Sequence, residues 1–246
     1  MILMGIVNLT PDSFYEASRV CGMAELQART ADLISRGCSI LDLGAVSTRP
    51  GAADVSEEEE WRRLQPALRC LARMQPALSP SAGLPPLSVD TTRAGIVRKV
   101  HAETGPFIVN DISAGEDDPQ MLSTVAELSL PYVAMHKRGN PRSMDSLTDY
   151  PEGVTAAVMQ YFREFEARAA AAGISDWILD PGFGFAKTSE QNWQLLRDLK
   201  EFRVFGRPIL AGVADKRFTK DPLFNGGDLQ AAEKMAACVA DILRIH

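Results

Sequence analysis

The stretch ILMGIVNLTPDSF, residues 2–14, shows the pattern from which the fold of this chain can be argued. Its apolar first half, residues 2–7, is typical of a short buried strand. Polar residues then follow at once, beginning with Asn8, and Pro11 prevents the loop from continuing as a strand or a helix. The amide, hydroxyl and carboxylate groups of this loop suit a hydrated magnesium ion or a phosphate. If the same pattern recurs along the chain, this loop forms one wall of an active site.

The pattern of a strand followed by a polar loop recurs to the end of the sequence. Short apolar runs, expected to be strands, alternate with amphipathic stretches, expected to be helices. The expected strands are residues 2–7, 39–43, 86–90, 106–110, 131–135, 176–180, 207–212 and 240–245. The expected helices are residues 23–36, 57–74, 92–103, 118–128, 152–172, 189–200 and 228–238. This order predicts an α/β protein with one domain over residues 1–246, a (β/α)8 TIM barrel.

Two features bear on this fold prediction. An open doubly wound sheet would need fewer strands and usually a glycine fingerprint after the first strand, which is absent here. The sequence ends at His246 on the expected eighth strand, so the last helix of the barrel is lacking. Without that helix, apolar surface on the first and eighth strands stays uncovered. We therefore expect either a truncated sequence or a partner that covers this side.

Composition narrows the classes of partner and the compartment. The 246 residues carry a net charge of -6, spread along the chain, which argues against nucleic acid or a membrane surface as the main partner. The four cysteines lack CxxC spacing, so reduced thiols in a cytoplasm are expected. No apolar run reaches membrane length. The acidic run at residues 57–60 follows Ser56 and predicts the start of a helix.

Polar residues stand at or just past the end of all eight expected strands. Any one of them could be only a turn former or a helix cap. The whole series instead predicts an active-site face, because the carboxyl ends of barrel strands meet on one side. Asp90, Asn110 and Asp180 suit the donor and acceptor edge of a flat heterocycle.

Cationic and aromatic residues complete the expected site. The cationic side chains around the rim suit a diphosphate, and they are Arg49, Lys216, Arg244 and His246. Phe14, Phe183 and Phe185 are candidates for apolar walls near a second substrate, although core packing is the favoured role of Phe183.

Eight segments resemble a known family in their residues and in their order. They are MGIVNLTPDSF at 4–14, DLG at 42–44 with STRPG at 47–51, SVDT at 88–91, VNDIS at 109–113, MHKRG at 135–139, DPGFGF at 180–185 with KT at 187–188, Lys216, and RIH at 244–246. Together they resemble the dihydropteroate synthases, and the first, second and sixth segments are highly specific. The resemblance covers residues 4–246.

The resemblance implies a reaction in folate biosynthesis and the substrates for it. The family joins para-aminobenzoate to (7,8-dihydropterin-6-yl)methyl diphosphate, giving 7,8-dihydropteroate and releasing diphosphate. It is the target of sulfonamides, uses Mg²⁺, and forms dimers near the region of the last helix. We therefore expect a cytoplasmic transferase, with a homodimer implied by the resemblance alone.

The resemblance also implies a role for each matched residue. Asp90, Asp180, Lys216 and Arg244 would be the catalytic residues; the first three would hold the pterin together with Asn110 and Met135. Asn8 would bind the magnesium ion, while Arg49, Arg244 and His246 would bind the diphosphate. Thr48, Pro50, Phe14 and Phe185 would help to close the aminobenzoate site when the loops at 8–16 and 45–54 order.

Three departures from the family pattern stand out. After the seventh strand the family usually has Ser-Arg-Lys-Ser, where this chain has ADKR at residues 214–217. Arg217 therefore replaces a hydroxyl that helps to bind the aminobenzoate carboxylate, and Asp215 reverses a charge. Arginine binds carboxylates well, so binding could survive with an altered response to sulfonamides. The usual Gly-Glu before the STRPG segment is Ala-Val at residues 45–46, and the last helix is lacking.

Two alternative functions stay open at this point. A pterin-dependent methyltransferase would share Asp90, Asn110 and Asp180, but it would not need the loops that serve diphosphate and aminobenzoate. A catalytically silent or divergent pterin-binding paralogue is supported by the altered residues 215–217. The presence of Asn8, Arg49, Arg244 and His246, which a pure pterin binder would not need, argues against that paralogue.

Overall fold

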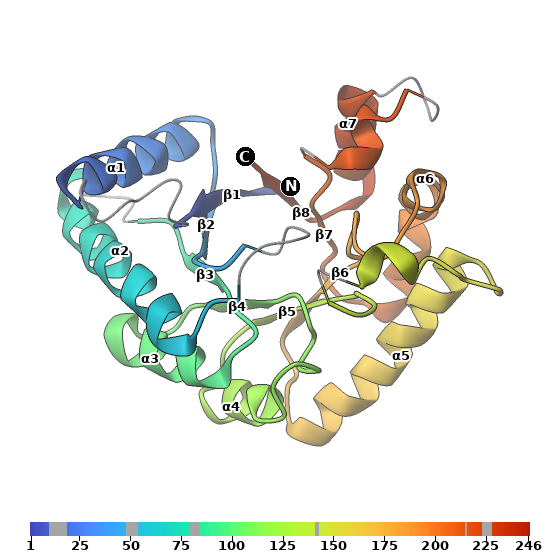
Figure 1. The fold of residues 1–246 in the computed structure, drawn as a ribbon, viewed down its shortest axis with the longest axis horizontal. Coiled ribbons are helices and arrows are strands. Elements are labelled where there is room, and N and C mark those ends of the chain that lie inside the picture. The colour runs from blue at the N-terminus through green and yellow to red at the C-terminus, as the bar shows by residue number, and fades with distance from the viewer. Residues whose placement is uncertain (10–18, 48–53, 79–83, 141–142, 215, 223–227) are drawn as a thin grey trace.

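Eight parallel strands form the centre of the molecule and helices surround them, as Figure 1 shows. The computed structural model describes residues 1–9, 19–47, 54–78, 84–140, 143–214, 216–222 and 228–246. The strands are β1 (Ile2–Asn8), β2 (Ile40–Gly44), β3 (Leu87–Asp90), β4 (Ile108–Asp111), β5 (Tyr132–Met135), β6 (Trp177–Asp180), β7 (Leu210–Ala211) and β8 (Ile242–Ile245). Their order in the sheet is β6-β5-β4-β3-β2-β1-β8-β7.

One bridge nearly closes the sheet into a barrel. The edge strand β6 meets the residue directly before β7 through a parallel bridge between Leu179 and Ile209, and the amide of Leu179 donates to the carbonyl of Pro208 at 2.9 Å. The (β/α)8 barrel is therefore confirmed, and the open doubly wound sheet is excluded.

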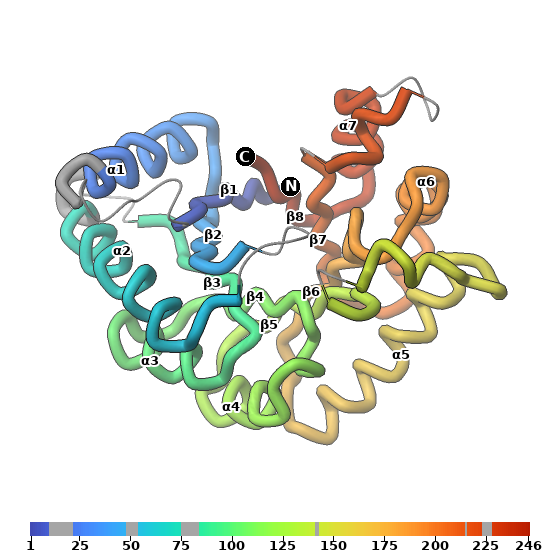
Figure 2. Tube along the Cα trace, in the orientation of Figure 1, coloured from blue at the N-terminus to red at the C-terminus, as the bar shows by residue number. Residues whose placement is uncertain are grey.

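The helices alternate with the strands along the chain and form the outer layer (Figure 2). They are α1 (Arg19–Ser35), α2 (Glu57–Leu78), α3 (Ala94–Thr104), α4 (Met121–Glu127), α5 (Val154–Ala172), α6 (Ser189–Arg197) and α7 (Leu229–Val239). Short 3-10 turns follow at η2 (Met144–Ser146), η3 (Leu199–Phe205) and η4 (Arg217–Lys220). Every helix and strand expected from the sequence is present, with ends shifted by a few residues. Within the described ranges no helix follows β8, and none is long and apolar enough to cross a membrane.

Local sequence explains where several helices begin. Ser56 accepts a hydrogen bond from the amide of Glu59 at 3.2 Å, so the acidic run does begin α2, where carboxylates face the positive end of the helix. Thr188 and Gln191 form a reciprocal capping box at the start of α6. Asp228 caps α7 by accepting from the amide of Ala231 at 2.9 Å.

Inward-facing residues of the barrel form an apolar floor with a polar layer above it. The buried floor consists of Met4, Ile40, Val133, Ile178, Leu210 and Ile242, with Ile108 packed against it. Because side chains alternate along a strand, the residue two positions further on also faces inward. Above Ile40, Ile108, Ile178 and Ile242 these residues are Asp42, Asn110, Asp180 and Arg244. The apolar residues thus plug the barrel, and the polar ones gather at the carboxyl ends of the strands.

Candidate active site

Asp42 on β2 forms one half of the polar layer through hydrogen bonds to residues of β3 and β4. The carboxylate of Asp42 accepts from Nδ2 of Asn110 at 3.0 Å and from Oγ of Ser88 at 2.7 Å. All three side chains are buried. These bonds fix the orientation of the Asn110 amide and leave its Oδ1 buried without a hydrogen-bond partner in the part of the chain that is described. An orphaned acceptor of this kind is suited to a donor on a bound ligand.

Asp180 and Arg244 form the other half of the polar layer. Oδ1 of Asp180 accepts from the amide of Gly182 at 2.8 Å, while Oδ2 lies 3.3 Å from Nη2 of Arg244. The second contact is an ion pair by distance only, because Oδ2 has no partner of hydrogen-bonding geometry among the described residues. The guanidinium lies against Gly212, where a Cβ atom would approach Nη2 to 2.9 Å. Any larger residue at position 212 would therefore push Arg244 out of this place.

Three carboxyl groups surround this single guanidinium, and their electrostatics follow from burial. Desolvation raises the pKa of Asp42, and it raises the pKa of Asp90 to about 8, with the negative charge of Asp42 as the second cause. Asp90 stays partly exposed at the mouth, where solvent limits this rise while the mouth is open. Burial alone would lower the pKa of Arg244, but Asp180, Asp42 and Asp90 more than offset it and raise that pKa. The site can therefore hold a proton on a carboxyl near neutral pH.

Beside the polar layer lies a buried apolar wall. Met135 at the end of β5 packs with Ile112, Met144 and Phe185 in one cluster. The ammonium of Lys216 lies 4.8 Å from the centre of the Phe185 ring, close enough for a cation–π contact. A flat ring held by the Asn110 and Asp180 acceptors would thus have an apolar surface at hand.

Phe183 lies in the core, not at the site. It is 1% exposed and stacks on Phe218 with ring centres 6.1 Å apart. The packing role favoured for Phe183 from the sequence is confirmed.

Three further candidate residues lie at the rim. Asn8 is exposed at the end of β1, and a Cβ atom placed on Gly44 would lie 3.9 Å from its Oδ1 and 3.7 Å from Oδ2 of Asp90. Arg217 is exposed and pairs with Asp145 at 2.7 Å, and His246 is exposed after β8. Other candidates lie outside the described residues: Phe14, Thr48, Arg49 and Pro50, together with the substituted Asp215.

The side-chain amide oxygen of Asn8 fits a magnesium ion that keeps most of its bound water. Within the described ranges no group of three or more histidine, cysteine, aspartate or glutamate side chains could hold a metal. Mg²⁺ commonly binds through one or two protein oxygens, several waters and the phosphates of a substrate. One amide oxygen at the rim is compatible with that mode and not with a cage made of protein ligands alone.

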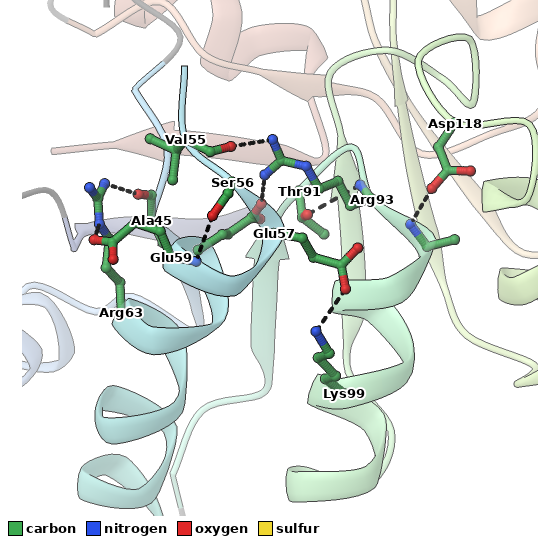
Figure 3. Close-up of polar contacts among 12 residues, drawn as sticks. Ala45, Val55, Ser56, Glu57, Glu59, Arg63, Thr91, Arg93, Lys99 and Asp118 are labelled. Carbon is green, nitrogen blue, oxygen red and sulfur yellow. Dashed lines mark hydrogen bonds and ion pairs between the residues drawn. The ribbon is translucent and has the colours of Figure 1, made fainter. Parts of the chain in front are cut away.

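Two arginines hold the chain on either side of residues 46–54 (Figure 3). Arg63 donates to the carbonyl of Ala45 at 2.8 Å and pairs with Glu59 at 2.7 Å. Arg93, the N-cap residue of α3, donates to the carbonyl of Val55 and pairs with the buried Glu60. Glu59 and Glu60, in the acidic run that begins α2, therefore also hold the two arginines that bind the chain before and after residues 46–54.

Some residues of the site were not assigned a role from the sequence. Asp42 lies in the DLG segment that matches the family but has no predicted role, because its bonds to Ser88 and Asn110 depend on the pairing of three strands. Asp111, beside Asn110 in the sequence, does not join the site. Its carboxylate accepts from Ser113, Gly115 and the hydroxyl of Tyr132, so all its capacity serves local structure.

Comparisons with known proteins agree with this geometry. The family pattern described as "Pterin binding enzyme" matches residues 4–246. A dihydropteroate synthase of Synechocystis sp. is 36% identical over 255 residues, covering 99% of this chain and 84% of that protein. The structure of Xanthomonas albilineans dihydropteroate synthase with 4-aminobenzoic acid matches with a TM-score of 0.82 at 35% identity, covering 100% of this chain and 87% of that chain. A Yersinia pestis dihydropteroate synthase in a sulfonamide drug complex matches with a TM-score of 0.81 at 31% identity, covering 100% and 88%.

The chain therefore belongs to the family of pterin-binding enzymes. Within that family it belongs with the dihydropteroate synthases, which are transferases. The family resemblance seen in the sequence is thus confirmed over the whole barrel.

Proposed function

We propose that the polar layer at the barrel mouth catalyses the condensation of (7,8-dihydropterin-6-yl)methyl diphosphate with para-aminobenzoate. The observation that carries this proposal is a pair of buried acceptors, Oδ1 of Asn110 and Oδ2 of Asp180, that have no hydrogen-bond donor among the described residues. A pterin ring presents an amino group and ring N–H donors along one edge, and these match such acceptors. Asp90 adds a third polar group beside them, and Met135 and Lys216 complete the pocket for the ring.

Breaking the bond between the pterin methylene group and the diphosphate requires stabilisation of opposite charges on the two parts. As the methylene–oxygen bond breaks, negative charge develops on the diphosphate and positive charge on the pterin methylene group. Arg244 can stabilise the first, and the Asp180 carboxylate can stabilise the second, joined by Asp90 where that carboxyl is ionised, since preorganised charges act strongly in a site with little water. The diphosphate leaves with the bonding electron pair. The amine of aminobenzoate is a weak base and therefore already a free nucleophile near neutral pH. It forms the new carbon–nitrogen bond and then releases one proton to water, so no strong general base is needed.

A magnesium ion held at Asn8 would neutralise charge on the leaving diphosphate. Arg49, Arg244 and His246 would bind the same group, and arginine suits it because its planar fork forms paired hydrogen bonds. Thr48, Pro50, Phe14 and Phe185 would line the aminobenzoate site. Arg217 would bind the aminobenzoate carboxylate after leaving Asp145, a switch favoured by the 75% exposure of its side chain.

We also propose a cytoplasmic location and a homodimer. Cys38, Cys70 and Cys238 are free thiols, which suits a reducing compartment. The dimer rests on the family resemblance, and light scattering on the full-length protein would measure it.

The decisive experiment follows diphosphate release by purified protein given the pterin diphosphate, with and without para-aminobenzoate. We expect release that depends on aminobenzoate and on Mg²⁺, with 7,8-dihydropteroate formed in equal amount. Well-folded protein that binds the pterin but shows no such release would instead be a silent pterin-binding paralogue.

A further inference from the structure

Lys187 is a buried cation that the proposed reaction does not use. It is 8% exposed and ends the turn that follows β6. Its Nζ lies 2.8 Å from the carbonyl oxygen of Gly182, 3.0 Å from that of Phe185 and 3.0 Å from Nδ1 of His136. Burying an ammonium is costly unless its hydrogen bonds are made, and here three partners meet it. Lys187 therefore fixes the main chain of Gly182 and Phe185 relative to His136.

The partners of Lys187 belong to or adjoin the turn that follows Asp180. The amide of Gly182 donates to Oδ1 of Asp180, and the carbonyl of the same glycine accepts from Lys187. Gly182 has a φ of +71°, and a Cβ atom there would lie 2.0 Å from the carbonyl oxygen of His136. The glycine is therefore confined between the main chain of His136 and the ammonium of Lys187. Moving Lys187 would move the donor that orients the Asp180 carboxylate.

We propose that Lys187, together with His136, is a positioning residue that holds the Gly182 turn and thereby aims Asp180 at the pterin. This inference rests on the proposed role of Asp180 in binding the pterin ring. Lys187 does not touch the substrate; it acts through Gly182.

The pair of Lys187 and His136 can keep three hydrogen bonds in either protonation state. As an ammonium, Lys187 donates to both carbonyls and to Nδ1 of a neutral imidazole. As a neutral amine, it still donates to both carbonyls and accepts from Nδ1–H once His136 has changed tautomer. The hydrogen bonds that hold the turn are thus kept both below and above the pKa of Lys187. Methionine in place of Lys187 could make none of these bonds.

The surroundings place this titration in the neutral range. Desolvation lowers the pKa of Lys187 to about 7, the negative charge of Asp180 opposes that change, and Arg138 and Lys216 add to it. Desolvation, helped by the charges of Lys187 and Arg138, lowers the pKa of His136 well below its usual value, so the imidazole stays neutral.

Two tyrosine rings pack on His136, those of Tyr150 and Tyr161. Burial raises the pKa of both phenols, so neither adds a charge near neutral pH. A change of pH between 6 and 8 therefore acts on this pair mainly through the lysine proton.

The first test compares Lys187→Met with Tyr150→Phe. The hydroxyl of Tyr150 donates to the carbonyl of Ala186 at 3.0 Å, so its removal takes one bond from the same turn without changing charge. We expect Lys187→Met to lower kcat/KM for the pterin diphosphate by about tenfold or more, while the inhibition constant of diphosphate changes by less than about twofold. Tyr150→Phe should change neither value by more than about twofold. Unchanged kcat/KM in Lys187→Met, or an equal loss in both measurements, would overturn the proposal.

The second test uses the wild-type protein, so it stands even if Lys187→Met does not fold. Nitrogen-15 NMR of the imidazoles, with the signals of His136 identified by their loss in His136→Gln, reports the tautomer directly. We expect the proton to move from Nε2 to Nδ1 as the pH rises from 6 to 8.5. A single tautomer across that range would refute the proton exchange between the two residues.

Asp180→Asn separates this inference from the proposed function. If Asp180→Asn leaves pterin binding unchanged, the assignment of Asp180 fails, and the role of Lys187 fails with it. If Asp180→Asn weakens pterin binding but Lys187→Met does not, only the role of Lys187 fails.

Discussion

Nη2 of Arg244 lies 3.3 Å from Oδ2 of Asp180, inside the barrel mouth and without hydrogen-bonding geometry. If Asp180 binds the pterin and Arg244 the diphosphate, as proposed, their contact in the free protein should change when the substrate binds. A pterin donor would take Oδ2, and the guanidinium would turn towards the diphosphate. Binding of the pterin would therefore release Arg244 for the diphosphate.

Asp180→Asn tests this division of roles. We expect kcat to fall by about a hundredfold or more, because the carboxylate stabilises positive charge that develops only as the bond breaks. Binding of diphosphate should stay within about threefold or tighten, since Arg244 loses its competing carboxylate. Steady-state kinetics and product-inhibition constants measure both quantities. An equal loss of turnover and diphosphate affinity would contradict the assignment.

Asp90→Asn should make the protein more stable, by an amount that grows with pH. Burial raises the pKa of Asp90 to about 8, so the folded state holds this proton more tightly than the unfolded state does. The carboxyl group therefore lowers the stability of the wild type progressively as the pH rises from about 4 towards 8. The amide cannot ionise, so the advantage of Asp90→Asn in Tm should grow over that range, to at least about 2 °C.

Differential scanning calorimetry at several pH values, with Asp145→Asn as a surface control, measures this effect. The carboxylate of Asp145 is 56% exposed, and its substitution should show no comparable growth with pH. A Tm advantage of Asp90→Asn that shrinks as the pH rises would show that the carboxyl is stabilised by its surroundings.

Asp42→Asn should be tolerated where Asp42→Ala is not. The asparagine can accept from Asn110 and donate to Ser88, because a hydroxyl can accept as well as donate. Pterin affinity should then stay within about threefold for Asp42→Asn and fall about tenfold for Asp42→Ala, which frees the Asn110 amide. Titration with pteroic acid or a pterin analogue gives both affinities. Equal losses in the two variants would mean that the charge of Asp42, not its geometry, matters.

The folded protein should lose stability when the buried carboxylate of Glu60 lacks Arg93. Arg93→Met leaves the carboxylate of Glu60, which is 1% exposed, without its cation, and we expect a loss of about 2 kcal/mol or more in the free energy of unfolding. The double variant Glu60→Gln with Arg93→Met should recover part of that loss. Arg69 pairs with Glu103 across the same two helices but is 55% exposed, so Arg69→Met should cost less than about 1 kcal/mol. Urea unfolding curves compare all three.

Asn8→Ala tests the magnesium proposal. If the amide oxygen is one ligand of the ion, the Mg²⁺ concentration for half-maximal activity should rise about tenfold, and excess Mg²⁺ should restore most of the turnover. Chelation by EDTA should abolish aminobenzoate-dependent release in both proteins. An unchanged Mg²⁺ requirement in Asn8→Ala would remove Asn8 from the metal site.

The sequence predicted the fold and the central polar residues for one physical reason. Alternation along each strand places Asn110 and Asp180 above the apolar Ile108 and Ile178, so a short apolar run followed by a polar residue marks both the strand and the site. Contacts between segments far apart in the sequence could not be predicted from this alternation. Arg217 meets Asp145, and Lys187 meets His136, only because separate barrel loops lie side by side.

The short pairing between β6 and the β7 region affects where the barrel opens locally. β7 has two residues, and among the described residues one bridge, from Leu179 to Ile209 just before β7, joins this side, whereas each other neighbouring pair shares a longer ladder. Fewer main-chain bonds must break to open this side, so its amides should exchange with deuterium sooner than those of β1 and β2. Asp180 lies at the end of one of these strands and Lys216 a few residues beyond the other. If Asp180 and Lys216 hold the pterin as proposed, this side of the site is thus expected to open locally more readily than the side formed by β1 and β2.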